Sequence, residues 1–174
     1  MANPQLNGKD SAALKEVGID VFLTGANTID EIQSSIEMIG KVLQKEEEAT
    51  GLVAKIDDKI NYFKENDNNE LKTLIVFGVP GSWMVALPDS LSGNMLEAVG
   101  GYNIAKDYPK LERFPQYAQL ETEKIIQANP EAVLLISPAP IKDITEQFSK
   151  EMEENPVWNS VDAITNGNVI TLPN

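Results

Sequence analysis

The sequence predicts an α/β fold with a mainly parallel sheet, preceded by one long helix. Short apolar segments bounded by glycine, proline or asparagine are typical of buried strands, and they occur at 74–77, 132–136 and 169–172. Helical patterns separate these strands, at 92–99, 121–128 and 142–152. Such alternation favours parallel strands with helices on both faces of the sheet.

The composition is that of a globular protein, with 42% hydrophobic and 24% charged residues in a chain of 174. Lys and Arg number 14 against 27 Asp and Glu, so the net charge is −13 (14 − 27). A chain this acidic repels phosphate backbones, and a nucleic-acid partner is not expected. The chain has no cysteine and no histidine, which removes disulfides, thiolate ligands and the usual general base. Any enzyme would have to rely on carboxylates, Lys or Tyr, and we expect no metal site, no cofactor and no catalytic residue.

The first part of the chain is predicted to be mostly helical. A short helix is expected at 11–17 and a buried apolar strand at 19–23. Thr28 and Glu31 then have the spacing of a capping box, in which Thr28 accepts from the amide of Glu31 and the Glu31 carboxylate reaches back. Apolar residues recur at helical spacing as far as Leu43, so an amphipathic helix follows.

A second helical pattern covers residues 46–65 and begins with three acidic residues, which favour a helix N-terminus. A helix of that length spans about 30 Å at about 1.5 Å per residue. A single helix this long between two α/β segments resembles a spine or linker more than a crossover. We therefore divide the chain into residues 1–27, residues 28–66 with the long helix, and residues 67–174 with the sheet.

Smaller features complete the expected third segment. Pro80 and Gly81 suit the central positions of a type II turn, and a short second strand is expected at 84–87. Residues 102–119 hold most of the aromatic side chains and are expected to be irregular. Trp158 is expected to be an anchor in the core.

Several segments, taken in order, resemble one known family. They are 14–21, 36–49, 96–104 (LEAVGGYNI), 121–136 (with ETEKIIQANPE) and 156–169. Together they resemble the helical-backbone solute-binding proteins of ABC importers, which take up iron-siderophores, haem and cobalamin. Residues 77–86 (FGVPGSWMVA) are especially similar to Gram-positive haem- and ferrichrome-type uptake lipoproteins.

The resemblance implies two α/β lobes joined by a rigid helix, with ligand held between them, no catalysis, and an ABC permease as partner. It also implies that residues 1–27 are a remnant of the N-terminal lobe, and that 67–174 form the C-terminal lobe. Most of the N-terminal lobe, its lipidated N-terminus and a C-terminal helix would then be missing. Such a parent protein is expected at the extracellular face of the membrane, held by lipid, or in the periplasm.

Ligand contacts are expected where strands end, since ligands of parallel sheets sit at the carboxyl ends of strands. Trp83 and Tyr117 are candidates for stacking on a planar or apolar ligand, and Arg113, the chain's one arginine, for binding a ligand acid. The remaining candidates lie in the segments after two strands, at Ser82 and Ser137. The alternative to ligand binding is ordinary burial in the core for the two aromatic residues, and an ordinary surface position for Arg113.

The resemblance also assigns Glu123 to docking on permease arginines, although a glutamate in a first helical turn is common in any case. Haem receptors of this kind carry a histidine after the strand that matches 132–136, whereas this sequence has Ser137-Pro-Ala-Pro-Ile. A siderophore, or haem held from the other lobe, therefore fits better than haem ligated by this lobe.

Two other classes of protein compete with a binding lobe. A small α/β hydrolase or nucleotide-binding domain would need a nucleophile elbow or a glycine fingerprint, and the sequence contains neither. A stand-alone interaction module is the other alternative. The strand at 19–23, separated from its own lobe, would need another partner, so a swapped or edge-paired homodimer is also expected.

Overall fold

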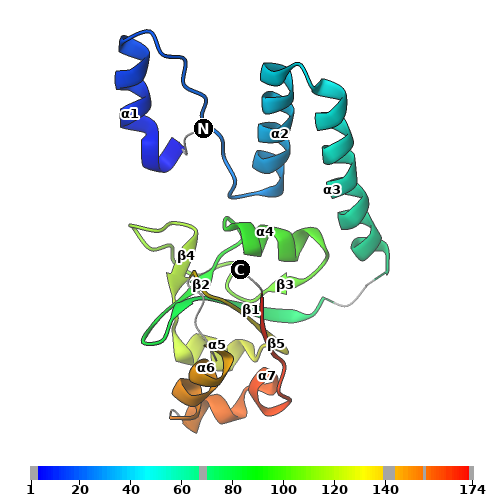
Figure 1. The fold of residues 1–174 in the computed structure, drawn as a ribbon. Helices are drawn as coiled ribbons and strands as arrows, with labels where there is room; N and C mark the ends of the chain where they lie inside the picture. Colours follow the sequence, from blue (N-terminus) through cyan, green and yellow to red (C-terminus); the bar gives the residue numbers. More distant parts are fainter. Residues whose placement is uncertain (1–3, 67–69, 139–143, 155, 173–174) are drawn as a thin grey trace. The chain divides into compact units, whose positions relative to one another are not determined.

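The computed structural model describes residues 4–66, 70–138, 144–154 and 156–172. The chain divides into two compact units, Met1–Tyr62 and Phe63–Asn174. The first unit is helical and the second contains the sheet (Figure 1). None of the described helices is both long and apolar enough to cross a membrane.

The helical unit contains α1 (Pro4–Glu16), α2 (Ile29–Leu43) and most of α3 (Glu46–Asn66). The predicted capping box is present: the Glu31 amide donates to Thr28 Oγ1 at 3.2 Å. The Glu31 carboxylate reaches back one residue further than expected and accepts from the Asn27 amide at 2.8 Å. Both the helix that starts after Thr28 and the long helix from Glu46 are therefore confirmed.

The backbones of α2 and α3 approach each other closely near the turn that connects the two helices. Gln44 ends α2 in the left-handed conformation, with φ of 56°, and α3 begins two residues later. Gly40 is buried at this crossing, and a Cβ there would lie 2.5 Å from the Cβ of Ala49. Only glycine therefore lets the two helices meet so closely.

The predicted strand at 19–23 is wrong. Only Leu23 makes a bridge, the other residues of the segment form no strand, and Ile19 is 51% exposed. The apolar pattern is real, but a strand needs a neighbour to satisfy its backbone, and the described part of this unit supplies only helices besides that bridge. The homodimer that was expected to pair this segment stays a prediction.

The second unit contains a 6-stranded sheet in the order β4-β2-β1-β5-β6, with β3 also paired to β1. Its strands are β1 (Lys72–Val79), β2 (Ser82–Ala86), β3 (Tyr102–Asn103), β4 (Tyr117–Gln119), β5 (Ala132–Ile136) and β6 (Val169–Thr171). The pairs β1–β3, β1–β5 and β5–β6 are parallel, whereas β1–β2 and β2–β4 are antiparallel. The α/β fold with a mostly parallel sheet is confirmed.

The predicted strands and helices of this unit are present within two or three residues of their expected ends. The helices are α4 (Leu91–Ala98), α5 (Thr122–Ala128), α6 (Ile144–Glu153) and α7 (Asp162–Thr165), with a 3₁₀ turn, η1 (Pro156–Ser160). Residues 142 and 143 of the expected sixth helix lie outside the described residues. The segment 102–119, expected to be irregular, includes the short strands β3 and β4.

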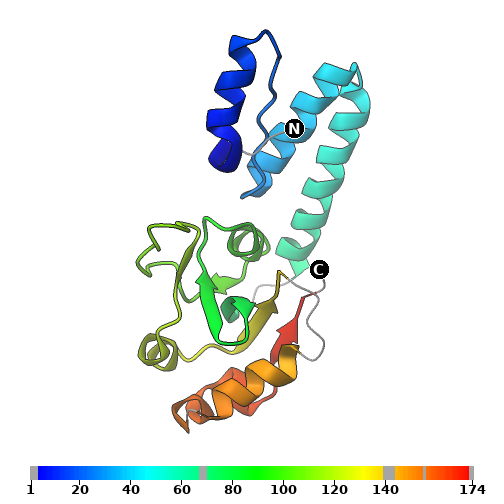
Figure 2. The same ribbon diagram turned by 60° about the vertical axis from the view of Figure 1, so that its left-hand side comes forward.

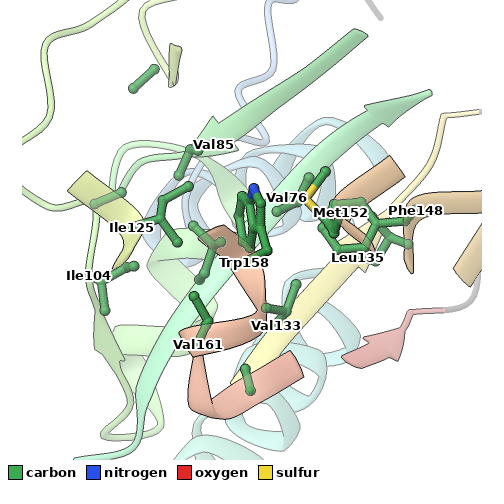
Figure 3. Packing of buried hydrophobic residues seen from close by; sticks show 14 of the residues in the cluster. Val76, Val85, Ile104, Ile125, Val133, Leu135, Phe148, Met152, Trp158 and Val161 are labelled. Carbon is green, nitrogen blue, oxygen red and sulfur yellow. The ribbon is translucent and has the colours of Figure 1, made fainter. Parts of the chain in front are cut away.

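Helices cover both faces of the sheet, with α4 on one side and α5 to α7 on the other (Figures 1 and 2). The main core lies on the second side, where side chains from β1, β2 and β5 meet those of α5, α6, η1 and α7 (Figure 3). Trp158 sits in this cluster and is 1% exposed, which confirms its predicted role as an anchor.

Candidate functional site

The carboxyl ends of β1 and β5 define the edge at which candidate residues gather. The two strands are parallel, and Phe77 pairs with Ile136 in the last register position. The β1–β2 turn follows β1 directly, and Ser137 follows β5. Ligands of open α/β sheets bind at such an edge, so ligand contacts are expected at this edge.

The β1–β2 turn is formed by Pro80 and Gly81, between the paired residues Val79 and Ser82. Gly81 has φ of 75°, the left-handed conformation that the third position of a type II turn requires. Gly78 is also needed, because a Cβ there would lie 2.2 Å from the carbonyl oxygen of Ser82. The tight turn fixes the register that places Trp83 opposite Gly78.

Trp83 lies on the sheet face that packs against α6. Its ring meets Phe148 edge to face, with centroids 5.2 Å apart, and its indole nitrogen donates to Glu151 Oε2 at 2.6 Å. The amide of Gly81 donates to the same carboxylate, 2.9 Å from Oε1. The half-buried indole is thus held by the protein itself.

Tyr117 lies on the opposite face of the sheet from Trp83. In the antiparallel register Tyr117 pairs with Ala86, whereas the core residues Val85 and Ala118 pair with each other, and successive side chains of a strand alternate between faces. Tyr117 stacks on Phe77, with ring centroids 4.9 Å apart and an interplanar angle of 27°. The two aromatic residues predicted to share a ligand are therefore separated by the sheet.

An apolar cavity of about 500 Å³ opens beside Tyr117, between α4 and the sheet. Strand residues, α4 residues and Leu172 line it: Phe77, Tyr117, Leu134, Ile136, Leu172, Leu91, Ser92, Met95, Leu96 and Val99. Burial raises the pKa of the Tyr117 phenol, as expected for a hydroxyl among apolar groups. A neutral ring in such a cavity can stack on an apolar or planar group.

Arg113 lies in an exposed loop that leads into β4. Main-chain bonds fold this loop back on itself: Leu111 donates to the Tyr117 carbonyl and Tyr117 donates to the Phe114 carbonyl, both at 2.9 Å. The Arg113 guanidinium lies over the ring of Phe114, 5.4 Å from its centroid. The loop thus carries a cation a few residues along the chain from Tyr117.

The other predicted residues are dispersed. Ser82 is exposed at the start of β2, whereas Ser137 is buried and only 4% exposed. Glu123 is exposed in the first turn of α5. Of the predicted set, Tyr117 alone lines the apolar cavity, and Trp83 and Ser82 belong to the β1–β2 turn region.

Sequence reasoning missed Phe77 and Glu151. Phe77 was assigned to a buried strand and to the segment 77–86 that carries the family resemblance, but not to the site. Its contact with Tyr117 depends on a pairing between distant segments. Glu151 belongs to an acidic cluster at 151–154, a pattern that is typical of a solvated helix face. Its one signal was electrostatic, because a carboxylate near a helix C-terminus is unfavourable unless something compensates it.

The described residues contain no group of three or more Asp or Glu side chains placed to hold a metal ion, and the sequence supplies no histidine or cysteine. The two remaining features of the site are an apolar cavity and positioned aromatic rings. These suit binding by contact and enclosure.

Residues 7–174 match the family described as "Periplasmic binding protein". The chain belongs to this family. It is 26% identical over 165 residues to the high-affinity heme uptake system protein IsdE of Staphylococcus aureus, covering 91% of this chain and 53% of that protein. The chain thus spans about half the length of the curated relatives it matches.

Solved structures of this family share the fold. An ABC transporter substrate-binding protein from Listeria monocytogenes matches with a TM-score of 0.81 and 25% identity, over 98% of this chain and 65% of that one. S. aureus IsdE complexed with heme matches with a TM-score of 0.77 and 22% identity, over 99% of this chain and 66% of that one. The resemblance to helical-backbone solute-binding proteins is therefore confirmed.

Proposed function

We propose that this chain is part of the substrate-binding component of an ABC importer for haem-like or iron-siderophore ligands. The observation that carries the proposal is the apolar cavity with its Phe77–Tyr117 stack, found in a chain of the periplasmic binding protein family. The names of its relatives, which include a heme uptake protein, support the ligand class. The ring of Tyr117 supplies apolar contact and Arg113 supplies charge for a ligand acid.

Within this function we propose that neither the Tyr117 phenol nor a histidine or cysteine of this chain bonds the ligand iron. The sequence contains no histidine or cysteine, and a phenol whose pKa is raised by burial resists becoming the phenolate that iron prefers. A ferric siderophore, whose iron is already chelated, needs no protein ligand. Haem would need an axial ligand of another kind, or one from another part of the longer protein.

The remaining assignments follow from the same family membership. We place the protein at the extracellular face of the membrane or in the periplasm, with an ABC permease as partner and the exposed Glu123 as a docking residue. The segment from 67 to 174 is assigned as the C-terminal lobe, residues 1–27 as part of the N-terminal lobe, and α3 as the linker between lobes.

Calorimetric titration tests the proposal. Haem, a ferric hydroxamate siderophore and cobalamin are titrated into the 174-residue chain and into the longer protein to which it is assigned. We expect the longer protein to bind haem or the siderophore, and the chain alone to bind the same ligand more weakly. Absence of binding by the longer protein to all of them contradicts the proposed function.

A further inference from the structure

The carboxylate of Glu151 joins the β1–β2 turn to α6. It accepts from the amide of Gly81 at 2.9 Å and from the indole nitrogen of Trp83 at 2.6 Å. Gly81 is part of the turn and Trp83 is the second residue after it, so both donors belong to one short segment. We propose that Glu151 is a positioning residue that fixes this turn for ligand binding, an inference that rests on the proposed function.

The turn has few other restraints. Gly81 is exposed, and no atom lies within 4 Å of the position that a Cβ would take. The antiparallel ladder ends at Val79 and Ser82, and the Gly81 amide donates to an acceptor outside the sheet, the Glu151 carboxylate. The Glu151 carboxylate is therefore the contact that sets the orientation of the turn.

The location of Glu151 makes its charge costly for the helix. It lies in the last turn of α6, where the helix dipole disfavours an anion. None of the ion pairs found among the described residues includes it, and it accepts from two neutral N–H donors. A carboxylate is the strongest acceptor a side chain offers to such donors, so the site favours Glu over a neutral residue for holding the turn.

A second contact between α6 and the turn region is aromatic. Phe148 lies three residues before Glu151, on the same side of α6, and meets the Trp83 ring at 5.2 Å. Phe148 is fully buried in the main core. Trp83 thus anchors the turn to the buried core through its contact with Phe148. Glu151 adds a polar contact, which a substitution can remove.

Three variants of the 174-residue chain test the role: Glu151→Gln, Glu151→Ala and Glu154→Gln. Glu154 is exposed, follows at the end of the same helix and provides a control for loss of negative charge. Amide exchange of Gly81 and indole exchange of Trp83 are followed by NMR. The affinity and dissociation rate for haem and a ferric hydroxamate are measured on the same samples.

We expect Glu151→Ala to raise both exchange rates about ten- to a hundredfold, because alanine offers no acceptor to the two N–H groups. Glu151→Gln should raise them less, because glutamine loses the charge but keeps an acceptor oxygen. Ligand dissociation should accelerate in the same order, whereas Glu154→Gln should match the wild type. If the exchange rates of the Gly81 amide and the Trp83 indole are unchanged in Glu151→Ala, the proposal that Glu151 holds the turn is overturned. Faster exchange with unchanged dissociation overturns the role in binding and leaves a structural contact.

The result also separates this inference from the function on which it rests. If the wild-type chain and the longer protein bind neither ligand, the proposed function fails, and with it the role in binding. The exchange measurements still decide whether Glu151 holds the turn.

Discussion

The ring of Tyr117 stacks on the ring of Phe77 at 4.9 Å, on the sheet face opposite to Trp83. One face of the β1–β2–β4 region therefore carries an indole fixed to α6, and the other an aromatic pair open to an apolar cavity. Trp83 ties the turn to α6, and we propose that Tyr117, on the other face, contacts a ligand.

Substitution of Tyr117 distinguishes its ring from its hydroxyl. Tyr117→Ala is expected to weaken haem or siderophore binding about tenfold, because an aromatic contact contributes about 1 kcal/mol beyond burial. Tyr117→Phe should keep near-wild-type affinity, since the proposed contact uses the ring. Titration calorimetry measures both, with Tyr62→Ala, at a tyrosine that is 61% exposed in the other unit, as control. Equal affinity in Tyr117→Ala and wild type contradicts the assignment.

Stability at high pH should depend on Tyr117. Burial raises its pKa above the ordinary value of 10.0, so the unfolded chain loses the phenolic proton first. The free energy of unfolding is therefore unaffected by this group below about pH 10 and falls as the pH rises through the raised folded-state pKa. Tyr117→Phe should show a smaller loss of stability than wild type over this range, measured by urea unfolding at several pH values.

Tyr108 should contribute in the same direction, because burial, and secondarily the charge of Glu121, raises the pKa of its phenol. The double variant with Phe at 108 and 117 is expected to be less sensitive to high pH than either single variant. Tyr62→Phe is the matched control. An equal slope in the double variant and the wild type would show that neither buried phenol governs the alkaline loss of stability.

Local signals in the sequence predicted much of the fold. The strand at 132–136 is short, apolar and follows Asn-Pro, and it forms β5 with the expected bounds. The Thr28–Glu31 spacing marked the start of α2 because the cap is made within four residues. Elements whose stabilising contacts are nearby in sequence need no knowledge of the rest of the chain.

Contacts between distant segments were not predictable in this way. The two-residue turn at Pro80–Gly81 fixes the register of β2, and this places Trp83 on the same face as Val76. The position of Tyr117 depends instead on β4 pairing with β2 across about thirty residues, for which a single sequence gives no signal. The strand expected at 19–23 failed for a related reason, since apolar character alone does not supply a partner.

Asn103 is expected to be important for stability although it lies outside the cavity. Its side chain is 1% exposed, donates to the Ala86 carbonyl and accepts from the Ala105 amide, both at 3.0 Å. Asn103→Ala leaves two buried backbone groups unpaired and should lower the free energy of unfolding by about 2–4 kcal/mol. Asn159→Ala, at an exposed asparagine, should change it by less than about 0.5 kcal/mol. Urea unfolding followed by circular dichroism compares them, and similar values for the two variants would contradict the role of Asn103.

Two glycines in the helical unit should respond oppositely to the same substitution. Gly51→Ala places a methyl group where no atom lies within 4 Å, so it should stabilise α3 by about 0.8–1 kcal/mol through helix propensity. Gly40→Ala places its methyl group 2.5 Å from the Cβ of Ala49, and such overpacking should cost about 1–3 kcal/mol. The helical circular dichroism signal during thermal unfolding measures both effects. Stabilisation by Gly40→Ala would show that α2 and α3 do not cross as closely as the buried glycine requires.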